Sequence, residues 1–522
     1  MMRFYPLLLV IVLLSASCTG AAAPTPTLIP PTETATSTPT EAPTATTIPP
    51  TETATATSTP TETPTITPTA SITPTPYPTP QATVGFIFDN WELLTTSGDL
   101  LNSLNFPMVA YINQNDRDAV SNQGTPQPAT GVETLYYGSP TNSGNRVAVL
   151  QLAASTNNQV YLSANGHSVA YFNDGRDATT PDAGGLYMLN LDNRISGRIL
   201  PIRSMVQRGF FSDPVWTRDG TRLAMAVATG YDIDIFSIGS DGANLRNLTN
   251  HGSYDIWPAW SPDGTKLLFV SDRDTCPSWI PGEPNACDPS LTPQPVEGNV
   301  VGSIYIMDVE SGETRKLTHE MVSEPPRWLN NSTVTFATGD PTLGEPPERH
   351  LWIADVNTNN VQEVKLNDGS DGPIRLSEVW AADGSAVVYQ SVSDSGSEIV
   401  AVRRDGTLIG RTSELSFARY GMSASWSPDA TRIAIGGVGG QCPYGPRVLD
   451  AAFNFITRGN PPPGMCNPTY SADGLWVAFT GVNPRVDGRV DVLVANTNGT
   501  GTVNLTGSLR GAINFIGWVG GQ

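Results

Sequence analysis

Histidines and carboxylates follow two Leu-Thr pairs of the sequence and are the side chains best suited to chemistry. His251 lies just after Leu248-Thr249, with Asp255 close by, and His319 follows Leu317-Thr318 directly, with Glu320 and Glu324 close by. Imidazole and carboxylate groups bind divalent metals and transfer protons. These residues are therefore candidates for a metal or acid–base site. The alternative is that they are solvated loop residues whose positions correspond by chance.

Four cysteines form two closely spaced pairs in the body of the chain. Cys276 and Cys287 are near neighbours, and Cys442 and Cys466 bracket a second segment. In an oxidising compartment the simplest pairing is two short-range disulfides. A tetrahedral zinc site is the alternative, but the CxxC spacing of most structural zinc sites is missing.

Each cysteine pair lies in a segment that we expect to interrupt the regular pattern of the chain. The segments are 275–301, which contains Trp279, and 441–466, which contains Tyr444. Long ordered loops on a rigid scaffold commonly carry function. We therefore treat Trp279 and Tyr444 as candidate binding residues at the rim of a ligand site. The alternative is that both segments are purely structural loops.

A short sequence pattern, an aromatic residue followed by a turn, recurs along the chain. The strands around this pattern must position the candidate residues. After each copy come an apolar run, a second strand and a Gly-containing turn. Four short strands per roughly 40-residue unit are typical of a β-propeller blade. The recurrent Trp is best explained as a wedge packed between blades. The copies, the last three of them weaker, are Val215–Gly220, Ala259–Gly264, Val379–Gly384, Ser425–Ala430, Arg327–Asn331, Thr469–Gly474 and Leu162–Gly166.

One copy of this unit is especially complete, and it resembles a known family. Residues 255–273 read DIWPAWSPDGTKLLFVSDR, which is similar to the WD-repeat-like propeller repeat of TolB and related proteins. The resemblance covers roughly residues 100–522 and implies an all-β propeller fold. It says little about activity, because propellers serve many unrelated roles. Some propellers of this repeat type, such as oligogalacturonate lyases, use channel histidines with a divalent metal. Because His251 and His319 occupy nearly equivalent places just after Leu-Thr, we expect both to lie in loops that enter adjacent blades and to face the same end of the central channel.

The ends of the repeat region predict how the ring closes. Residues 515–520 look like the first strand of a further unit, and segments 108–112, 134–137 and 146–152 match second, third and fourth strands. Pairing them would remove exposed sheet edges. We therefore predict eight blades closed by pairing of N- and C-terminal strands, with seven blades as the alternative, in a propeller spanning residues 84–522.

The first seventeen residues are typical of an export signal. Arg3 precedes the apolar run Leu7–Leu14, which is too short to span a bilayer, and small residues lead to Cys18. This pattern resembles the lipobox of bacterial lipoproteins, although Ser15 stands where Leu is most common. We predict a signal peptide over 1–17 and lipidation of Cys18. An ordinary secreted protein is the alternative.

Residues 18–83 are predicted to form a stalk between the anchor and the propeller. Most of this segment consists of Thr, Pro, Ala, Ser and Glu. With few large apolar residues to offset the entropy of ordering, such a sequence stays unfolded, and its prolines favour extended polyproline II at roughly 3 Å per residue. The stalk would give the propeller reach.

The net charge limits the classes of partner that we expect this protein to bind. The chain carries a net charge of -20, which repels phosphate backbones, so we expect no nucleic-acid partner. The interpretation we favour is a non-catalytic envelope lipoprotein that needs no cofactor and binds a protein, peptide or glycan. The main alternative is a metal-dependent polysaccharide lyase or hydrolase acting at the channel. A structural component of the envelope is a third possibility.

The lipid anchor gives the first test. Replacing Cys18 with Ser removes the only thiol that could be acylated at the predicted cleavage site, so the variant should lose labelling by an alkyne-bearing palmitate and leave the membrane fraction. Cys276→Ser serves as the control and should keep both properties. Equal labelling of wild type and Cys18→Ser would contradict the prediction.

Overall fold

The computed structural model describes the strand-rich part of the chain. The described residues are 91–93, 102–114, 132–153, 159–173, 185–193, 195–201, 212–288, 300–339, 349–366, 374–393, 396–414, 421–438, 442, 445–458, 464–482 and 489–521. The predicted signal peptide, Cys18, the stalk 18–83 and Tyr444 lie outside them. Within these ranges no helix is long and apolar enough to cross a membrane.

The described strands belong to one compact unit, Pro74–Gln522, and form antiparallel sheets of four or more strands. The first sheet has the order β1 (Trp91–Leu93), β4 (Arg146–Ala153), β3 (Val132–Gly138), β2 (Met108–Gln114), β33 (Ala512–Val519). Five sheets have four strands each in chain order: β5 (Gln159–Leu162), β6 (Ser168–Asn173), β7 (Gly185–Asn190), β8 (Ile195–Pro201); β9 (Val215–Trp216), β10 (Arg222–Ala228), β11 (Ile233–Gly239), β12 (Arg246–Asn247); β13 (Asp255–Trp260), β14 (Lys266–Ser271), β15 (Gly302–Asp308), β16 (Thr314–Val322); β17 (Arg327–Trp328), β18 (Thr333–Thr338), β19 (His350–Asp355), β20 (Asn360–Glu363); β21 (Ile374–Trp380), β22 (Ala386–Ser393), β23 (Gly396–Arg403), β24 (Leu408–Thr412).

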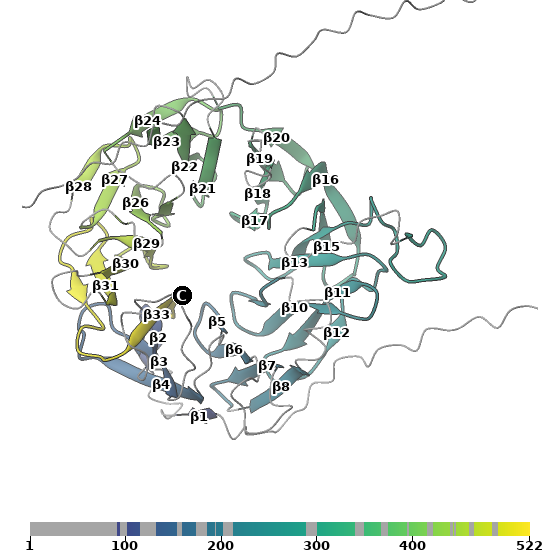
Figure 1. The fold of residues 1–522 in the computed structure, drawn as a ribbon, viewed down its shortest axis with the longest axis horizontal. Coiled ribbons are helices and arrows are strands. Elements are labelled where there is room, and N and C mark those ends of the chain that lie inside the picture. Colours follow the sequence, from purple (N-terminus) through teal and green to yellow (C-terminus); the bar gives the residue numbers. More distant parts are fainter. Residues whose placement is uncertain are drawn as a thin grey trace, which may run out of the picture. The chain divides into compact units, whose positions relative to one another are not determined.

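The last sheet contains two successive four-stranded sets joined by a parallel bridge between Gly437 and Cys466. Its strands are β25 (Met422–Trp426), β26 (Arg432–Gly437), β27 (Arg447–Asp450), β28 (Phe455–Arg458), β29 (Cys466–Tyr470), β30 (Trp476–Val482), β31 (Val490–Asn496) and β32 (Val503–Asn504). Figure 1 shows the sheets of this unit arranged around a centre, with first strands such as β13 and β17 innermost and fourth strands such as β16 and β24 outermost. The predicted all-β propeller fold is confirmed.

The recurrent turn between first and second strands is built by its own polar side chains. In the copy at Ser261, the serine Oγ donates to Asp263 at 2.6 Å and accepts from the Lys266 amide at 2.9 Å. The bond from Ser261 lowers the pKa of Asp263. Gly264 has a φ of +68°, a left-handed conformation that suits glycine. The Asp-Gly dipeptide thus fixes the hairpin, as the sequence predicted.

The recurrent Trp connects neighbouring sheets. Its indole Nε1 donates to a backbone carbonyl in the first strand of the preceding set, one residue before that set's own aromatic position. Burial of the ring together with this bond makes it the predicted wedge. The bonds run from Trp216 to Tyr161 (3.1 Å), Trp260 to Val215 (3.1 Å), Trp328 to Ala259 (3.0 Å), Trp426 to Val379 (3.1 Å) and Trp518 to Thr469 (2.8 Å).

The first and last parts of the described region meet in one sheet. Strand β33 pairs antiparallel with β2, in a register that places Met108 opposite Val519 and Gln114 opposite Ala512. Val109 and Tyr111 of β2 also share an apolar cluster with Val492 of β31. This is the terminal pairing that the sequence predicts. The count of eight blades and the closure of the ring remain predictions.

Both predicted disulfides are present, but only one lies in an insertion. Cys276 and Cys287 are bonded in the connection between β14 and β15, as expected for an interruption of the repeat. Cys442 and Cys466 are also bonded, yet the segment 441–466, predicted to be a loop excursion, contains strands β27 and β28. This expectation was wrong because these strands are short and close a hairpin through Asp450 and Phe453, which the Pro- and Gly-rich flanks obscure.

The indole bonds can be tested with Trp260→Phe, which keeps a ring in the 8% exposed site but loses the donor to Val215. A buried hydrogen bond contributes about 1 kcal/mol, and the unpaired carbonyl adds about as much, so the free energy of unfolding should fall by about 1 to 2 kcal/mol. Urea denaturation measures this. Phe106→Ala, at a 70% exposed side chain, should change it by less than about 0.5 kcal/mol. An unchanged value for Trp260→Phe would contradict the role of the bond.

Candidate functional site

The predicted channel-mouth residues occupy different kinds of position. His251 lies in the connection from β12 to β13, and Asp255 is the first residue of β13. His319 and Glu320 lie within β16, the outermost strand of its sheet, and His319 is exposed. They were predicted to lie in a loop. The difference arises because a register shift between Ser303 and Tyr305 lets β16 continue pairing to Val322.

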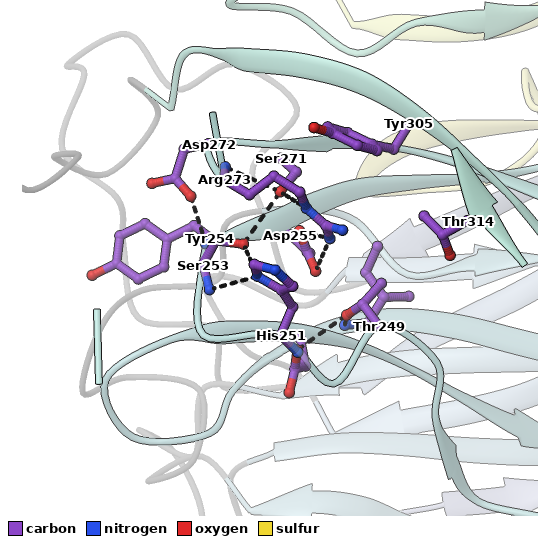
Figure 2. Close-up of polar contacts among 12 residues, drawn as sticks. Thr249, His251, Ser253, Tyr254, Asp255, Ser271, Asp272, Arg273, Tyr305 and Thr314 are labelled. Atoms are coloured by element: carbon purple, nitrogen blue, oxygen red, sulfur yellow. Dashed lines mark hydrogen bonds and ion pairs between the residues drawn. The ribbon is translucent and has the colours of Figure 1, made fainter. Parts of the chain in front are cut away.

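Asp255 forms a buried ion pair with Arg273 (Figure 2). The Arg273 Nη2 atom lies 2.9 Å from one carboxylate oxygen of Asp255 and 3.0 Å from the other, and its Nε donates to Ser271 at 2.8 Å. The guanidinium also lies 4.5 Å from the centroid of the Tyr305 ring. Asp255 is 0% exposed, and burial raises its pKa to about 6, although the charge of Arg273 opposes that shift. This pair holds β13 to β14 and is inaccessible to solvent on the carboxylate side.

His251 takes part in the same buried network. Its Nδ1 atom lies 2.7 Å from the Ser253 Oγ, and its backbone amide donates to Asp234 at 2.9 Å. Burial lowers the pKa of His251, and the charge of Arg273 adds to this effect. Both effects favour the neutral form of the imidazole. Its contacts orient the connection between the two strands.

Glu324 forms an ion pair with an arginine. Arg349 contacts Glu324 at 2.7 Å and Glu378 of β21 at 2.8 Å, so one guanidinium joins segments that belong to different sheets. Burial opposes the charge of Arg349, but the bonds from the two glutamates raise its pKa. In the described part of the chain, no group of three or more His, Cys, Asp or Glu side chains could hold a metal ion. The five predicted residues therefore form no common metal site there.

Trp279 is buried within the disulfide-bonded connection between β14 and β15. Its side chain is 4% exposed, its ring stacks on Tyr254 with centroids 5.2 Å apart, and its Nε1 donates to Asp272 at 2.9 Å. The other Asp272 oxygen accepts from the Tyr254 amide at 2.7 Å, and burial raises the pKa of Asp272 to about 6. In this arrangement Trp279 anchors the connection and presents no face to a ligand.

Three bulges in first strands were missed by the sequence reasoning. Trp257, Ser377 and Asn467 have φ values of 53°, 56° and 47°, each at a register shift with the second strand. Bulges re-aim side chains and increase local twist. The signal in the sequence is the proline that follows two of them, Pro258 and Pro468, because it removes a donor that the bulge would leave unpaired.

A recess lies where three first strands meet, and we name it the channel recess. Strands β5, β9 and β33 supply its walls, and its volume is about 460 Å³. None of the lining residues is Asp, Glu, Lys, Arg or His, in a chain with a net charge of -20. Sequence reasoning missed it because β33 and β5 are far apart in the chain. The lining residues are Val160, Tyr161, Leu162, Ala164, Pro214, Val215, Trp216, Ile516, Gly517, Trp518 and Val519.

Comparison with known proteins supports the predicted repeat. The chain is 37% identical over 89 residues to a protein named TolB homolog from Chlorobium luteolum, covering 17% of this chain and 19% of that protein. It is 32% identical over 104 residues to a TolB homolog from Chlorobium chlorochromatii, covering 18% and 23%. The match thus spans about a fifth of the length of these relatives. The predicted TolB-like propeller repeat is confirmed. No protein family model matches the chain.

Solved structures show weaker likeness. TolB from Acinetobacter baumannii has a TM-score of 0.30 at 15% identity, covering 70% of this chain and 82% of that one. An oligogalacturonate lyase in complex with manganese has a TM-score of 0.41 at 14% identity, covering 75% and 96%. An oligogalacturonate lyase from Vibrio parahaemolyticus has a TM-score of 0.39 at 13% identity, covering 75% and 97%. Similarity at this level carries no argument about function.

The raised pKa of Asp272 predicts a pH effect on stability. Because its folded value of about 6 exceeds the ordinary value of 3.8, the folded state binds more protons than the unfolded state between pH 4 and 6. Stability contributed by this group is therefore largest near pH 4 and falls as pH rises. The stability advantage of wild type over Asp272→Asn should shrink by about 2 to 3 kcal/mol between pH 4 and pH 7, measured by urea denaturation. A gap that stays constant or grows with pH would refute this assignment.

Proposed function

We propose that this TolB-like β-propeller protein is a non-catalytic binding protein of the cell envelope, which binds a protein, peptide or glycan partner at the channel recess. The observation that carries the proposal is the uncharged, aromatic lining of that recess in a strongly acidic chain. Recesses of a few hundred Å³ lined by apolar and aromatic groups are typical of ligand sites.

The chemistry of the lining favours binding over catalysis. The indole N–H groups of Trp216 and Trp518 are used in bonds to Tyr161 and Thr469, and the Tyr161 hydroxyl donates to Asp213 at 2.8 Å. Burial and the bond to Asp213 raise the pKa of Tyr161, so the phenol stays protonated. The lining thus offers apolar surface and strand backbone, and the carboxylate beside it, that of Asp213, accepts from the Tyr161 hydroxyl.

Envelope localisation rests on the sequence. The export signal over 1–17, lipidation of Cys18 and the stalk 18–83 would place the propeller at a membrane surface, at the end of an extended tether. A tethered propeller samples a volume around its anchor. Such an arrangement suits capture of a partner held elsewhere in the envelope.

Affinity capture tests the proposal. The full chain would be immobilised and incubated with detergent-solubilised envelope of the producing cells, and with a glycan array for the carbohydrate case. Ile516→Arg and Val160→Arg place a charged side chain in the recess from two different strands, β33 and β5. Both should reduce capture of a partner at least tenfold, since a buried charge without a partner opposes docking.

Asn514→Arg is the matched control, because it adds the same charge on the same strand β33 at an exposed side chain outside the recess lining. It should capture as wild type does. All variants are compared by melting temperature so that loss of the fold is recognised. Capture that survives in both recess variants, in folded protein, would place the binding site elsewhere and overturn the proposal.

A further inference from the structure

A second concave surface lies on the outer side of the unit, away from the channel recess, and we name it the outer groove. Strands β24 and β28 are the outermost strands of successive four-stranded sets and lie near one another in Figure 1. The two sets lie close together, as the direct approach of Gly410 to Phe453 shows. The groove has a volume of about 560 Å³ and is lined by Arg411, Thr412, Glu414, Phe453, Asn454, Phe455, Ile456 and Arg458.

Two arginines stand directly opposite each other beside this groove. Arg447 of β27 pairs in register with Arg458 of β28, and like charges at such a position repel. Among the described residues, the Nε atom of Arg447 is buried without a hydrogen-bond partner. Burial lowers the pKa of Arg447, and the charge of Arg458 adds to this effect, while Glu414 opposes it. An unpaired buried donor beside a second cation is a costly arrangement that a bound anion would relieve.

The carboxylates nearby only partly balance these charges. Glu414 lies 3.3 Å from Arg458, with side chains 53% and 59% exposed, and Glu398 lies 3.5 Å from Arg411. Such exposed pairs contribute little and exchange readily with other partners. Among the described residues, Arg447 and Arg458 share the Glu414 carboxylate, so these two opposed cations are only partly balanced on a chain with a net charge of -20. At physiological ionic strength the distant negative charge is screened beyond about 8 Å.

The backbone of the groove favours one kind of anion carrier. Strand β28 ends the order of its sheet, and β24 ends the order of its own, so each has one edge with no described strand partner. Ile456 projects from β28 with 43% exposure. An extended peptide can add to such an edge through main-chain hydrogen bonds, while its alternate side chains reach flanking groups.

A glycan is less suited to this groove. Sugars bind well where an aromatic face is free, but the guanidinium of Arg458 covers the Phe455 ring at 4.5 Å from its centroid, and Phe453 is 9% exposed. We propose that the outer groove docks an extended acidic peptide segment of a partner protein, which pairs with the edge of β28 and places carboxylates against Arg447, Arg458 and Arg411. This site is separate from the channel recess and does not depend on the function proposed for it.

Fluorescence anisotropy with the full chain tests this proposal. The probe is a fluorescein-labelled peptide of sequence Thr-Glu-Val-Glu-Thr-Glu, and the control peptide has Lys in place of every Glu. We expect binding of the acidic peptide only. Arg458→Glu should weaken it at least tenfold, whereas Arg403→Glu, which reverses an exposed charge at the end of β23, should leave it unchanged. N-methylation of alternate residues in the probe should abolish binding if strand pairing holds it.

Several results would overturn the proposal. These are no binding of the acidic peptide, equal loss in Arg403→Glu, and full binding of the N-methylated probe. Complete displacement by polygalacturonate at equal carboxylate concentration would make the site a glycan site, and displacement by millimolar inorganic phosphate would make it a simple anion site. A melting temperature equal to wild type is required of both variants. Binding at the channel recess is measured separately, with Ile516→Arg. A negative result at one site therefore leaves the proposal for the other site testable.

Discussion

The indole-to-backbone bonds between neighbouring sets of strands are the interaction on which the rest of this structure depends. A four-stranded sheet with two apolar faces cannot be stable alone and must bury both faces against neighbours. A carbonyl that burial would otherwise leave unpaired accepts from the indole of Trp216, Trp260, Trp328, Trp426 and Trp518, as the Val215 carbonyl does from Trp260. The same geometry, repeated from Trp216 to Trp518, sets the distance between first strands and hence the width of the space they enclose.

A second bond set explains the Leu-Thr pair before His251, Leu248-Thr249, and recurs at Leu505-Thr506. Asp234 accepts from Asn247 at 2.7 Å and from Thr249 at 3.1 Å, and Thr249 accepts from the Ile235 amide at 3.0 Å. Asp491 accepts from Asn504 at 2.9 Å and from Thr506 at 2.8 Å, and Thr506 accepts from the Val492 amide at 3.0 Å. The motif ties the fourth strand to the third. Thr318, which precedes His319, accepts instead from the Glu320 amide at 3.0 Å, so the two histidines follow Leu-Thr pairs with different bonds.

Local features could be read from the sequence, whereas features built from distant segments could not. The Ser-x-Asp-Gly turns and the Cys276–Cys287 disulfide depend on residues a short distance apart, and both were predicted. The Trp wedge joins residues of different sheets and was predicted from the recurrence of the Trp. The channel recess and the outer groove each require strands from different sets, and no local pattern marks them. The position of His319 was predicted wrongly because a bulge near Ser303 lengthens its strand. Registers and bulges follow from pairing, which a single sequence does not display.

We propose that this propeller binds a partner through surfaces between its strands, and among the described residues His251 and His319 belong to no group that could hold a metal ion. Elemental analysis of the full chain, purified without chelators, tests the proposal against a His251→Ala/His319→Ala double variant. We expect the same substoichiometric metal content in both proteins. One equivalent of a divalent metal in wild type, lost in the double variant, would contradict it and favour a metal-dependent enzyme acting at the channel.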